Sequence, residues 1–184
     1  MIERYSRKEL KDIWSEENKY KIWLEVEIAA AEAMEKFKMI PKGVSSIVKK
    51  KGKIKVKRIH DIEAKVKHDV IAFLTSITEQ AGIKARYLHQ GMTSSDVLDT
   101  SFNIQLIQSG KIILKDIDKI LIVLKRQAKK YKMTPCIGRS HGIHAEPITF
   151  GLKLASFYEE FKRNKKRLKD CLLYTSDAAD EHGC

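Results

Sequence analysis

Residues 97–131 read VLDTSFNIQLIQSGKIILKDIDKILIVLKRQAKKY, and this stretch decides the fold class. Apolar residues recur in it at spacings of three and four, which is the period of one face of a helix. The pattern lasts from Val97 to Tyr131, and Gly110 within it predicts a kink or a joint between two helices. A helical pattern of this length is typical of a helical bundle, so the stretch predicts an all-α protein.

Upstream of this stretch the periodic segments are also helical. Ser15 is a suitable N-cap for a helix from Glu16 to about Met39, and a further helix is predicted from about Lys57 to Ala81 with Gly82 as its C-cap. We expect an apolar stripe on the first of these helices, formed by Ile22, Val26, Ala29, Ala30, Ala33 and Phe37. No alternating pattern of useful length predicts a strand.

The chain is predicted to divide into a small N-terminal helical domain, residues 1–92, and the first part of a long central helical bundle, residues 93–170. From Cys171 the composition changes abruptly, and residues 171–184 resemble the translated end of a transposon adaptor used for sequencing libraries. Such segments should be left out of fold reasoning. We therefore expect the natural chain to be a truncated, N-terminal part of something larger.

Charge and composition restrict the class of protein. The 36 basic and 24 acidic residues give a net charge of +12, which suits nucleic acid, an anionic metabolite or a lysine-rich surface. The basic runs lack the interleaved aromatic residues of a single-strand binding surface, so a solvated face is favoured. Without a membrane-spanning run, a signal peptide or paired cysteines, the sequence predicts a soluble cytoplasmic protein that binds no metal, membrane or nucleic acid.

The segment Gly138–Gly151, GRSHGIHAEPITFG, gathers the groups that could do chemistry. It places an arginine, a hydroxyl, two imidazoles and a carboxylate within nine residues, with Pro147 following at once. Proline suits the first turn of a helix, so we expect a last helix from Pro147 to about Lys169, with the polar turn at its N-terminus. Free N–H groups there favour anions, which indicates chemistry on a carboxylate.

Three further stretches supply polar groups, and each also has an ordinary structural explanation. Arg4-Tyr5 suits phosphate recognition, Lys67-His68-Asp69 places an imidazole beside a carboxylate, and Thr93-Ser94-Ser95-Asp96 opens a helix with hydroxyl groups. The hydroxyls can cap the helix or help to hold a carboxylate. Neither a Walker loop, a Rossmann fingerprint nor paired metal ligands occur, so no cofactor is predicted.

Four segments, in this order along the chain, resemble the adenylosuccinate lyase family of the fumarase/aspartase superfamily: Ile2–Arg7, Lys67–Phe73, Gly91–Thr100 and Gly138–Pro147. The resemblance covers the chain from Met1 to about Asp170. It implies an all-α homotetramer with active sites assembled from three subunits. The implied reaction is β-elimination of fumarate from adenylosuccinate, giving AMP, and from the succinylated carboxamide ribotide of purine synthesis.

The resemblance also implies roles for particular residues. His141 resembles the general acid that protonates the leaving amine, and His68 resembles its helper near the phosphate. The expected ligands of the fumaryl carboxylates are Thr93, Ser94 and Ser140. The residues expected to face the nucleotide are Arg4, Tyr5 and Asp69, with His89 as a further candidate nearby.

Two departures from the family pattern matter. Ser140 stands where the family usually has threonine, and the hydroxyl is retained. The family's flexible loop with its catalytic serine base would lie beyond residue 170, so the 184-residue chain is expected to be inactive by itself. The alternatives are another superfamily lyase, such as argininosuccinate lyase or a cycloisomerase, and a basic helical module that binds RNA or acidic partners.

Overall fold

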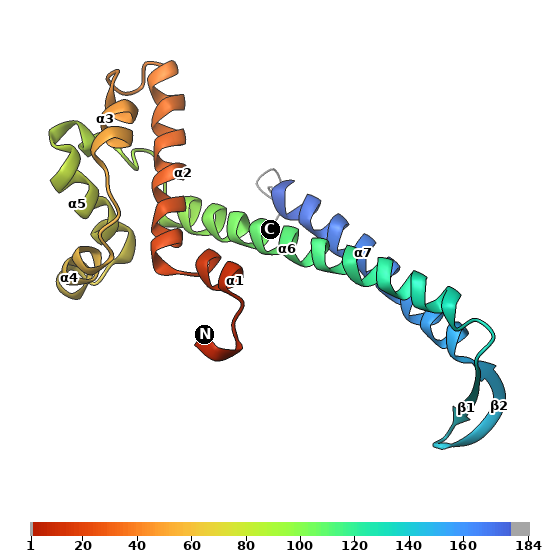
Figure 1. Ribbon diagram of the computed structural model, residues 1–184. Coiled ribbons are helices and arrows are strands. Elements are labelled where there is room, and N and C mark those ends of the chain that lie inside the picture. The colour runs from red at the N-terminus through yellow and green to blue at the C-terminus, as the bar shows by residue number, and fades with distance from the viewer. Residues whose placement is uncertain (1, 178–184) are drawn as a thin grey trace. The chain divides into compact units, whose positions relative to one another are not determined.

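The computed structural model describes residues 2–177 as helices with one small two-stranded sheet (Figure 1). The chain divides into two compact units, Met1–Gln105 and Leu106–Cys184, and the division falls within helix α6. The helices are α1 (Lys8–Ile13), α2 (Glu16–Lys36), α3 (Val44–Lys51), α4 (Val56–Val66), α5 (Asp69–Ala81), α6 (Ser94–Lys130) and α7 (Phe150–Asp177). Two 3-10 turns, Glu3–Tyr5 and Ile83–Tyr87, complete the helical elements, and the strands are β1 (Pro135–Ser140) and β2 (Ile143–Thr149). The predicted all-α class is confirmed for the architecture as a whole.

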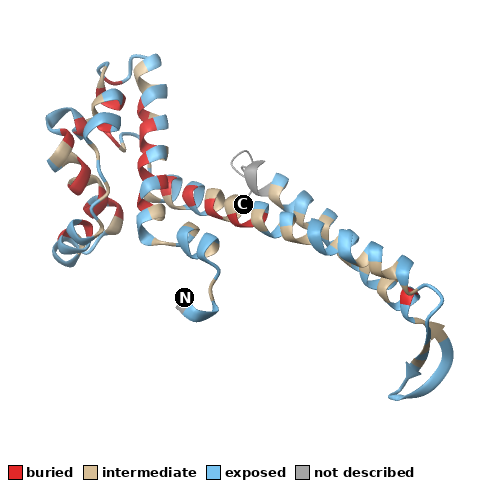
Figure 2. Ribbon diagram, viewed as in Figure 1, coloured by how far each residue is buried: buried red, intermediate tan, exposed pale blue. Residues whose placement is uncertain are grey.

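The hydrophobic core of the first unit lies around α2, where Figure 2 shows a row of buried residues. Tyr20 and Trp23 meet edge to face at 5.1 Å between ring centroids, and Phe73 of α5 meets Trp23 in the same way at 5.5 Å. Edge-to-face aromatic pairs add stabilisation beyond the area they bury. Burial also raises the pKa of Tyr20 to about 12. These rings fix α2 against α5.

The predicted apolar stripe of α2 is largely wrong. Of its six members only Ile22 is buried, and Phe37 is 73% exposed. The buried face instead consists of Tyr20, Ile22, Trp23, Leu24, Glu27, Ile28 and Ala31. The prediction failed because the row of alanines follows helical period equally well, while the large aromatic residues determine which face turns inward. Three residues of the predicted stripe, Val26, Ala29 and Ala30, instead line a surface groove together with Met92 and Ile104.

The helix predicted from Lys57 to Ala81 is two helices, α4 and α5. Lys67 takes a left-handed conformation with φ of 56° and ends α4, and His68 is extended. The His68 Nδ1 atom accepts the backbone N–H of Ile71 at 3.4 Å, so this side chain caps α5. Gly82 ends α5 as predicted, with φ of 81°. The apolar period continues through the break, which explains why the sequence alone suggested one helix.

Helix α6 runs through Gly110 without interruption, so the predicted joint between two helices is wrong, and the predicted kink stays a prediction. A Cβ atom at Gly110 would lie 2.5 Å from the side chain of Leu172 on α7. The Leu172 side chain would have to shift to make room for it, so glycine lets this side chain pack directly against α6. The segment from Cys171, predicted to be non-native, continues α7 to Asp177, and residues 178–184 lie outside the described residues.

The second unit pairs α7 with the part of α6 beyond Gln105, and apolar side chains remain exposed along both helices. They include Ile113, Ile120, Ile122 and Val123 on α6, and Leu152 and Phe157 on α7. Among residues 2–177, no helix has the length and apolarity needed to cross a membrane. The predicted domain limit at residue 92 stays a prediction.

One carboxylate holds the connection between α2 and α3. Glu35 accepts the backbone N–H of Gly43 at 3.1 Å and that of Ser45 at 2.7 Å, so it satisfies free donors at the start of α3. The bond from Ser45 is the main reason why the pKa of Glu35 is lowered from its ordinary value of 4.5. Because the pKa of Glu35 is lower in the folded state than in the unfolded state, the ionised carboxylate contributes to the free energy of unfolding above pH 4.5. This contribution decreases as the pH falls through the lowered pKa.

We expect Glu35→Gln to lower the free energy of unfolding by about 1–2 kcal/mol at neutral pH, because the amide oxygen can replace only one of the two acceptors. The difference from the unsubstituted chain should shrink as the pH falls through the lowered pKa, where the carboxyl group is protonated in both states. Urea unfolding at a series of pH values measures this. Glu25→Gln, an exposed change on the same helix, is the control. Equal stability at neutral pH would contradict the role of Glu35.

Candidate functional site

The segment that was predicted to carry chemistry forms a β-hairpin. Strands β1 and β2 are antiparallel, with Ser140 opposite Ile143, so His141 and Gly142 alone form the turn. Their φ angles are 51° and 78°. Positive φ at both central residues is what a type I′ turn requires, and such a turn matches the twist of the two strands. The turn exposes both His141 and Ser140 to solvent.

Two predictions about this segment are therefore wrong. Strands were not expected, and Pro147 was expected to open a helix, but it lies in β2 opposite Ile137. A two-stranded sheet leaves one edge of each strand free, and proline is tolerated on such an edge. Helix α7 begins three residues later, where the hydroxyl of Thr149 accepts the N–H of Leu152 at 3.1 Å. Thr149, rather than the polar turn, thus caps the helix.

The hairpin has an irregular register between Ile137 and Arg139, which places Gly138 at a bulge. A Cβ atom at Gly138 would lie 2.5 Å from the carbonyl oxygen of Glu146, so glycine allows the strands to approach here. Bulges of this kind bend a strand and redirect side chains. Of the three glycines in this segment, Gly138 thus allows a close approach of the strands, while Gly142 provides the positive φ of the turn.

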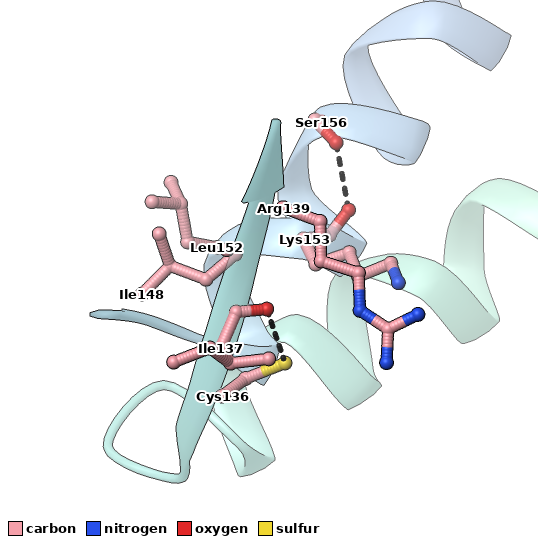
Figure 3. A pocket seen from close by; sticks show the side chains of 8 residues that line it. Cys136, Ile137, Arg139, Ile148, Leu152, Lys153 and Ser156 are labelled. Atoms are coloured by element: carbon pink, nitrogen blue, oxygen red, sulfur yellow. Dashed lines mark hydrogen bonds between the residues drawn. The ribbon is translucent and has the colours of Figure 1, made fainter. Parts of the chain in front are cut away.

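A hollow of about 580 Å³ lies between this hairpin and the start of α7. Figure 3 shows Arg139 and Lys153 on one side of it, with Ile148 and Leu152 on the other. The hydroxyl of Ser156 donates to the carbonyl oxygen of Lys153 at 2.7 Å, so its proton is already used and it cannot donate to an anion. The cationic side favours an anion. Ser140 and His141 do not line this hollow, and they lie beyond it at the tip of the hairpin.

The Lys67-His68-Asp69 sequence lies at the junction of α4 and α5. The carboxylate of Asp69 accepts the backbone N–H of Val70 at 2.7 Å. The same carboxylate oxygen, Oδ1, lies 3.5 Å from Nδ1 of His68. Since Nδ1 accepts from Ile71, Nε2 is the other ring nitrogen, and the His68 side chain is exposed to 43%. The junction therefore presents an imidazole and a carboxylate side by side.

The Thr93-Ser94 sequence begins α6. Thr93 is the residue before the helix, and its N–H donates to the carboxylate of Asp96 at 2.7 Å. This is one half of a capping box, in which an acidic side chain reaches back to the N-cap N–H. The helix start is thus fixed by Asp96. Thr93 itself is exposed, so its hydroxyl is accessible at a helix N-terminus, where carboxylates bind well.

His89 is the predicted site residue with the strongest contacts. Its ring Nδ1 lies 2.6 Å from Oε1 of Glu27, and its backbone N–H donates to Oε2 of the same carboxylate at 2.8 Å. Glu27 lies on α2 and is 1% exposed. The sequence analysis did not identify Glu27. A signal existed, because this acid falls between Trp23 and Ala31 on the buried face, where charged residues are rare unless paired.

The remaining predicted residues, Arg4 and Tyr5, form a local pair near the N-terminus. The Arg4 guanidinium carbon lies 4.7 Å from the Tyr5 ring centroid, and both residues are exposed. Within the described part of the first unit, no hydrogen bond or ion pair joins this pair, the His68–Asp69 pair and the His89 loop to one another. The structure thus contains several separate polar groups, of which the His89 group is held by a distant residue of the sequence, Glu27.

We expect Gly142→Ala to destabilise the hairpin by about 1–2 kcal/mol, because alanine has a Cβ atom that opposes the left-handed conformation. No atom lies within 4 Å of the position where the Cβ would stand, so the cost is conformational rather than a clash. Gly142→Asn, which tolerates positive φ, should retain most of the order and serves as the control. Amide hydrogen exchange across β1 and β2 measures the effect, and unchanged protection in the alanine variant would contradict it.

The chain is similar in sequence to a family of known enzymes. The family model described as lyase matches residues 3–178. Adenylosuccinate lyase of Thermotoga maritima is 48% identical over 169 residues, and that of Bacillus subtilis is 45% identical over the same length. Each alignment covers 92% of this chain and 39% of the relative. The chain therefore spans about two fifths of the length of the curated relatives it matches.

Solved structures give a consistent result. A fumarate lyase from Mesorhizobium sp. BNC1 matches with a TM-score of 0.82 and 26% identity, over 88% of this chain and 39% of that one. A 3-carboxy-cis,cis-muconate lactonizing enzyme from Pseudomonas putida matches with a TM-score of 0.79 and 26% identity, over 88% and 38%. Because the family model matches almost the whole sequence, this chain belongs to the lyase family.

Proposed function

We propose that this chain is part of an adenylosuccinate lyase, which releases fumarate from adenylosuccinate to give AMP. The observation that carries the proposal is the identity of 45–48% to two adenylosuccinate lyases over 92% of the chain. The same enzyme would split the succinylated carboxamide ribotide of purine synthesis. Its substrates are small anionic molecules, which agrees with the basic balance of the chain.

The proposed chemistry is β-elimination by general acid and base. A base removes the proton beside a carboxylate, the charge spreads onto that carboxylate, and the C–N bond breaks as an acid protonates the nitrogen. His141 would be this acid, and its exposed place at the hairpin tip leaves the imidazole accessible to a substrate. An imidazole titrates near neutral pH, so it can give up a proton under working conditions.

The binding groups fit the parts of the substrate. Thr93, Ser94 and Ser140 would hold the fumaryl carboxylates, for which the start of α6 provides both hydroxyls and free N–H groups. The residues proposed to face the nucleotide are Arg4, Tyr5, Asp69 and His89, with His68 near the phosphate. A phosphate requirement separates this function from argininosuccinate lyases and from cycloisomerases, whose substrates lack the nucleotide.

We infer that the whole enzyme is a cytoplasmic homotetramer in which three subunits contribute to each active site. The exposed apolar side chains of α6 and α7 support this, because soluble proteins seldom leave such rows uncovered. Residues of the two units would then reach a common site from different copies of the chain. Neither a membrane, a nucleic acid nor a cofactor has a part in the proposed reaction.

The test is a chimera in which residues 1–170 of this chain replace the matching part of the Thermotoga maritima relative. We expect it to release fumarate from adenylosuccinate and not from argininosuccinate. His141→Gln should lower kcat by about 10²–10⁴, the usual contribution of general acid–base catalysis. An optical assay of fumarate formation measures both. A folded chimera that acts on argininosuccinate, or on neither substrate, would contradict the proposal.

His60→Gln is the matched control for that substitution. His60 is an exposed imidazole whose Nε2 lies 3.0 Å from Glu16, and it belongs to none of the proposed binding groups. Its replacement should leave kcat within about twofold, as most surface changes do. A loss as large as that of His141→Gln would show that the assay reports folding rather than catalysis.

We expect the 184-residue chain by itself to release no fumarate, since the family resemblance implies that the serine base lies beyond residue 170. The measurement uses the purified, monodisperse chain with adenylosuccinate at the same protein concentration as the chimera. Fumarate release that His141→Gln abolishes would overturn this expectation, because it would show that the base lies within the chain.

A further inference from the structure

The carboxylate of Glu27 is buried within the core of the first unit, where a charge is costly without partners. Both of its oxygens contact a single residue, His89, which is 62 positions away in the sequence. The contact therefore joins the middle of α2 to the loop that precedes α6. Glu27 has no part in the proposed acid–base chemistry, so its burial needs another explanation.

Hydrogen-bonding capacity restricts the state of the pair. The backbone N–H of His89 can only donate, so Oε2 of Glu27 is an acceptor. With Glu27 ionised the carboxylate has no donor, and the 2.6 Å contact at Oε1 is then made by a proton on Nδ1 of His89. With Nδ1 engaged in this way, Nε2 is the ring nitrogen left for a ligand. The imidazole side of the pair is 19% exposed and the Glu27 side chain is fully buried.

The backbone of His89 adds a second constraint. Its φ of 61° is left-handed, which is uncommon for a residue with a side chain. The bond from its N–H to Glu27 Oε2 stabilises this conformation from a rigid helix. Gly91, with φ of 72°, and the capped residue Thr93 follow within four positions. The carboxylate thus fixes the loop close to the hydroxyls that begin α6.

We propose that Glu27 is a positioning residue, which holds His89 as the Nδ1–H tautomer and directs the unprotonated Nε2, as an acceptor, to a hydroxyl or amino group of the nucleotide. The first half of this proposal is a property of the chain itself. The second half rests on the proposed function, since it assigns Glu27 a share in substrate binding through His89. Partners of this kind usually matter for affinity when they fix the orientation and tautomer of an imidazole.

The first experiment measures the ring nitrogen shifts of His89 by NMR in the 184-residue chain, over a pH series that identifies the neutral ring. The expected result is a protonated Nδ1 and an unprotonated Nε2. A proton on Nε2 in the unsubstituted chain would overturn the proposal, because Glu27 would then be the donor. This measurement needs no variant and does not depend on catalysis.

The second experiment uses Glu27→Gln. A glutamine oxygen can accept the His89 N–H while its amide group donates to Nδ1, so the tautomer should invert to Nε2–H with the packing retained. The inverted ring could no longer accept a hydrogen bond at Nε2 from a hydroxyl or amino group of the nucleotide. In the chimera the KM for adenylosuccinate should therefore rise by about threefold to tenfold, with kcat changed less than about threefold, the size expected for losing a hydrogen bond between neutral groups. Glu17→Gln, an exposed change on α2, should alter neither quantity.

The outcomes separate the two halves of the proposal. An inverted tautomer with an unchanged KM would overturn the role of Glu27 in substrate binding. A parallel fall in kcat with KM unchanged would do the same. If the unsubstituted chimera is inactive, the proposed function fails, and the tautomer of the unsubstituted chain then decides the positioning role. If Glu27→Gln does not fold, that same measurement decides it.

Discussion

The packing of Trp23 against Tyr20 and Phe73 is the contact on which the rest of the first unit depends. It fixes the rotation of α2 about its own axis, because no other face of the helix offers rings of this size. Once that rotation is set, Glu27 must enter the core and Glu35 must face the start of α3. One helix therefore supplies two carboxylates that hold two separate loops, each of which also buries one apolar side chain, Ile40 before α3 and Leu88 before α6.

Much of the helical architecture could be predicted from the period of the apolar residues, and the errors have physical causes. The break at Lys67 was missed because it interrupts the hydrogen bonds of the helix without interrupting its apolar pattern. The hairpin was missed because Pro147 suits a helix start in sequence terms, while His141-Gly142 is an unusual form of a known turn signal. Both errors concern the backbone at positive φ, which a hydrophobic pattern does not report.

The polar residues of the candidate site could be identified from the sequence, but the residues that hold them in place could be identified only from the structure. The motif residues were identifiable because they are close neighbours in the chain. Glu27 was not, because its meaning comes from a partner on another element and from a burial that depends on the aromatic residues around it. Asp96 is an intermediate case. Its spacing of three residues from Thr93 is a capping pattern that can be recognised in the sequence, although the group proposed to bind substrate is the Thr93 hydroxyl.

The left-handed backbone of His141 has a consequence for how its sequence can vary. A turn selected for stability alone would carry asparagine or aspartate before Gly142, since these residues tolerate positive φ at lower cost. Histidine at this place gives up part of that stability, on the order of 1 kcal/mol. On the proposed function, the imidazole is a catalytic group kept at the expense of folding free energy. Selection for a more stable turn should therefore replace His141 first.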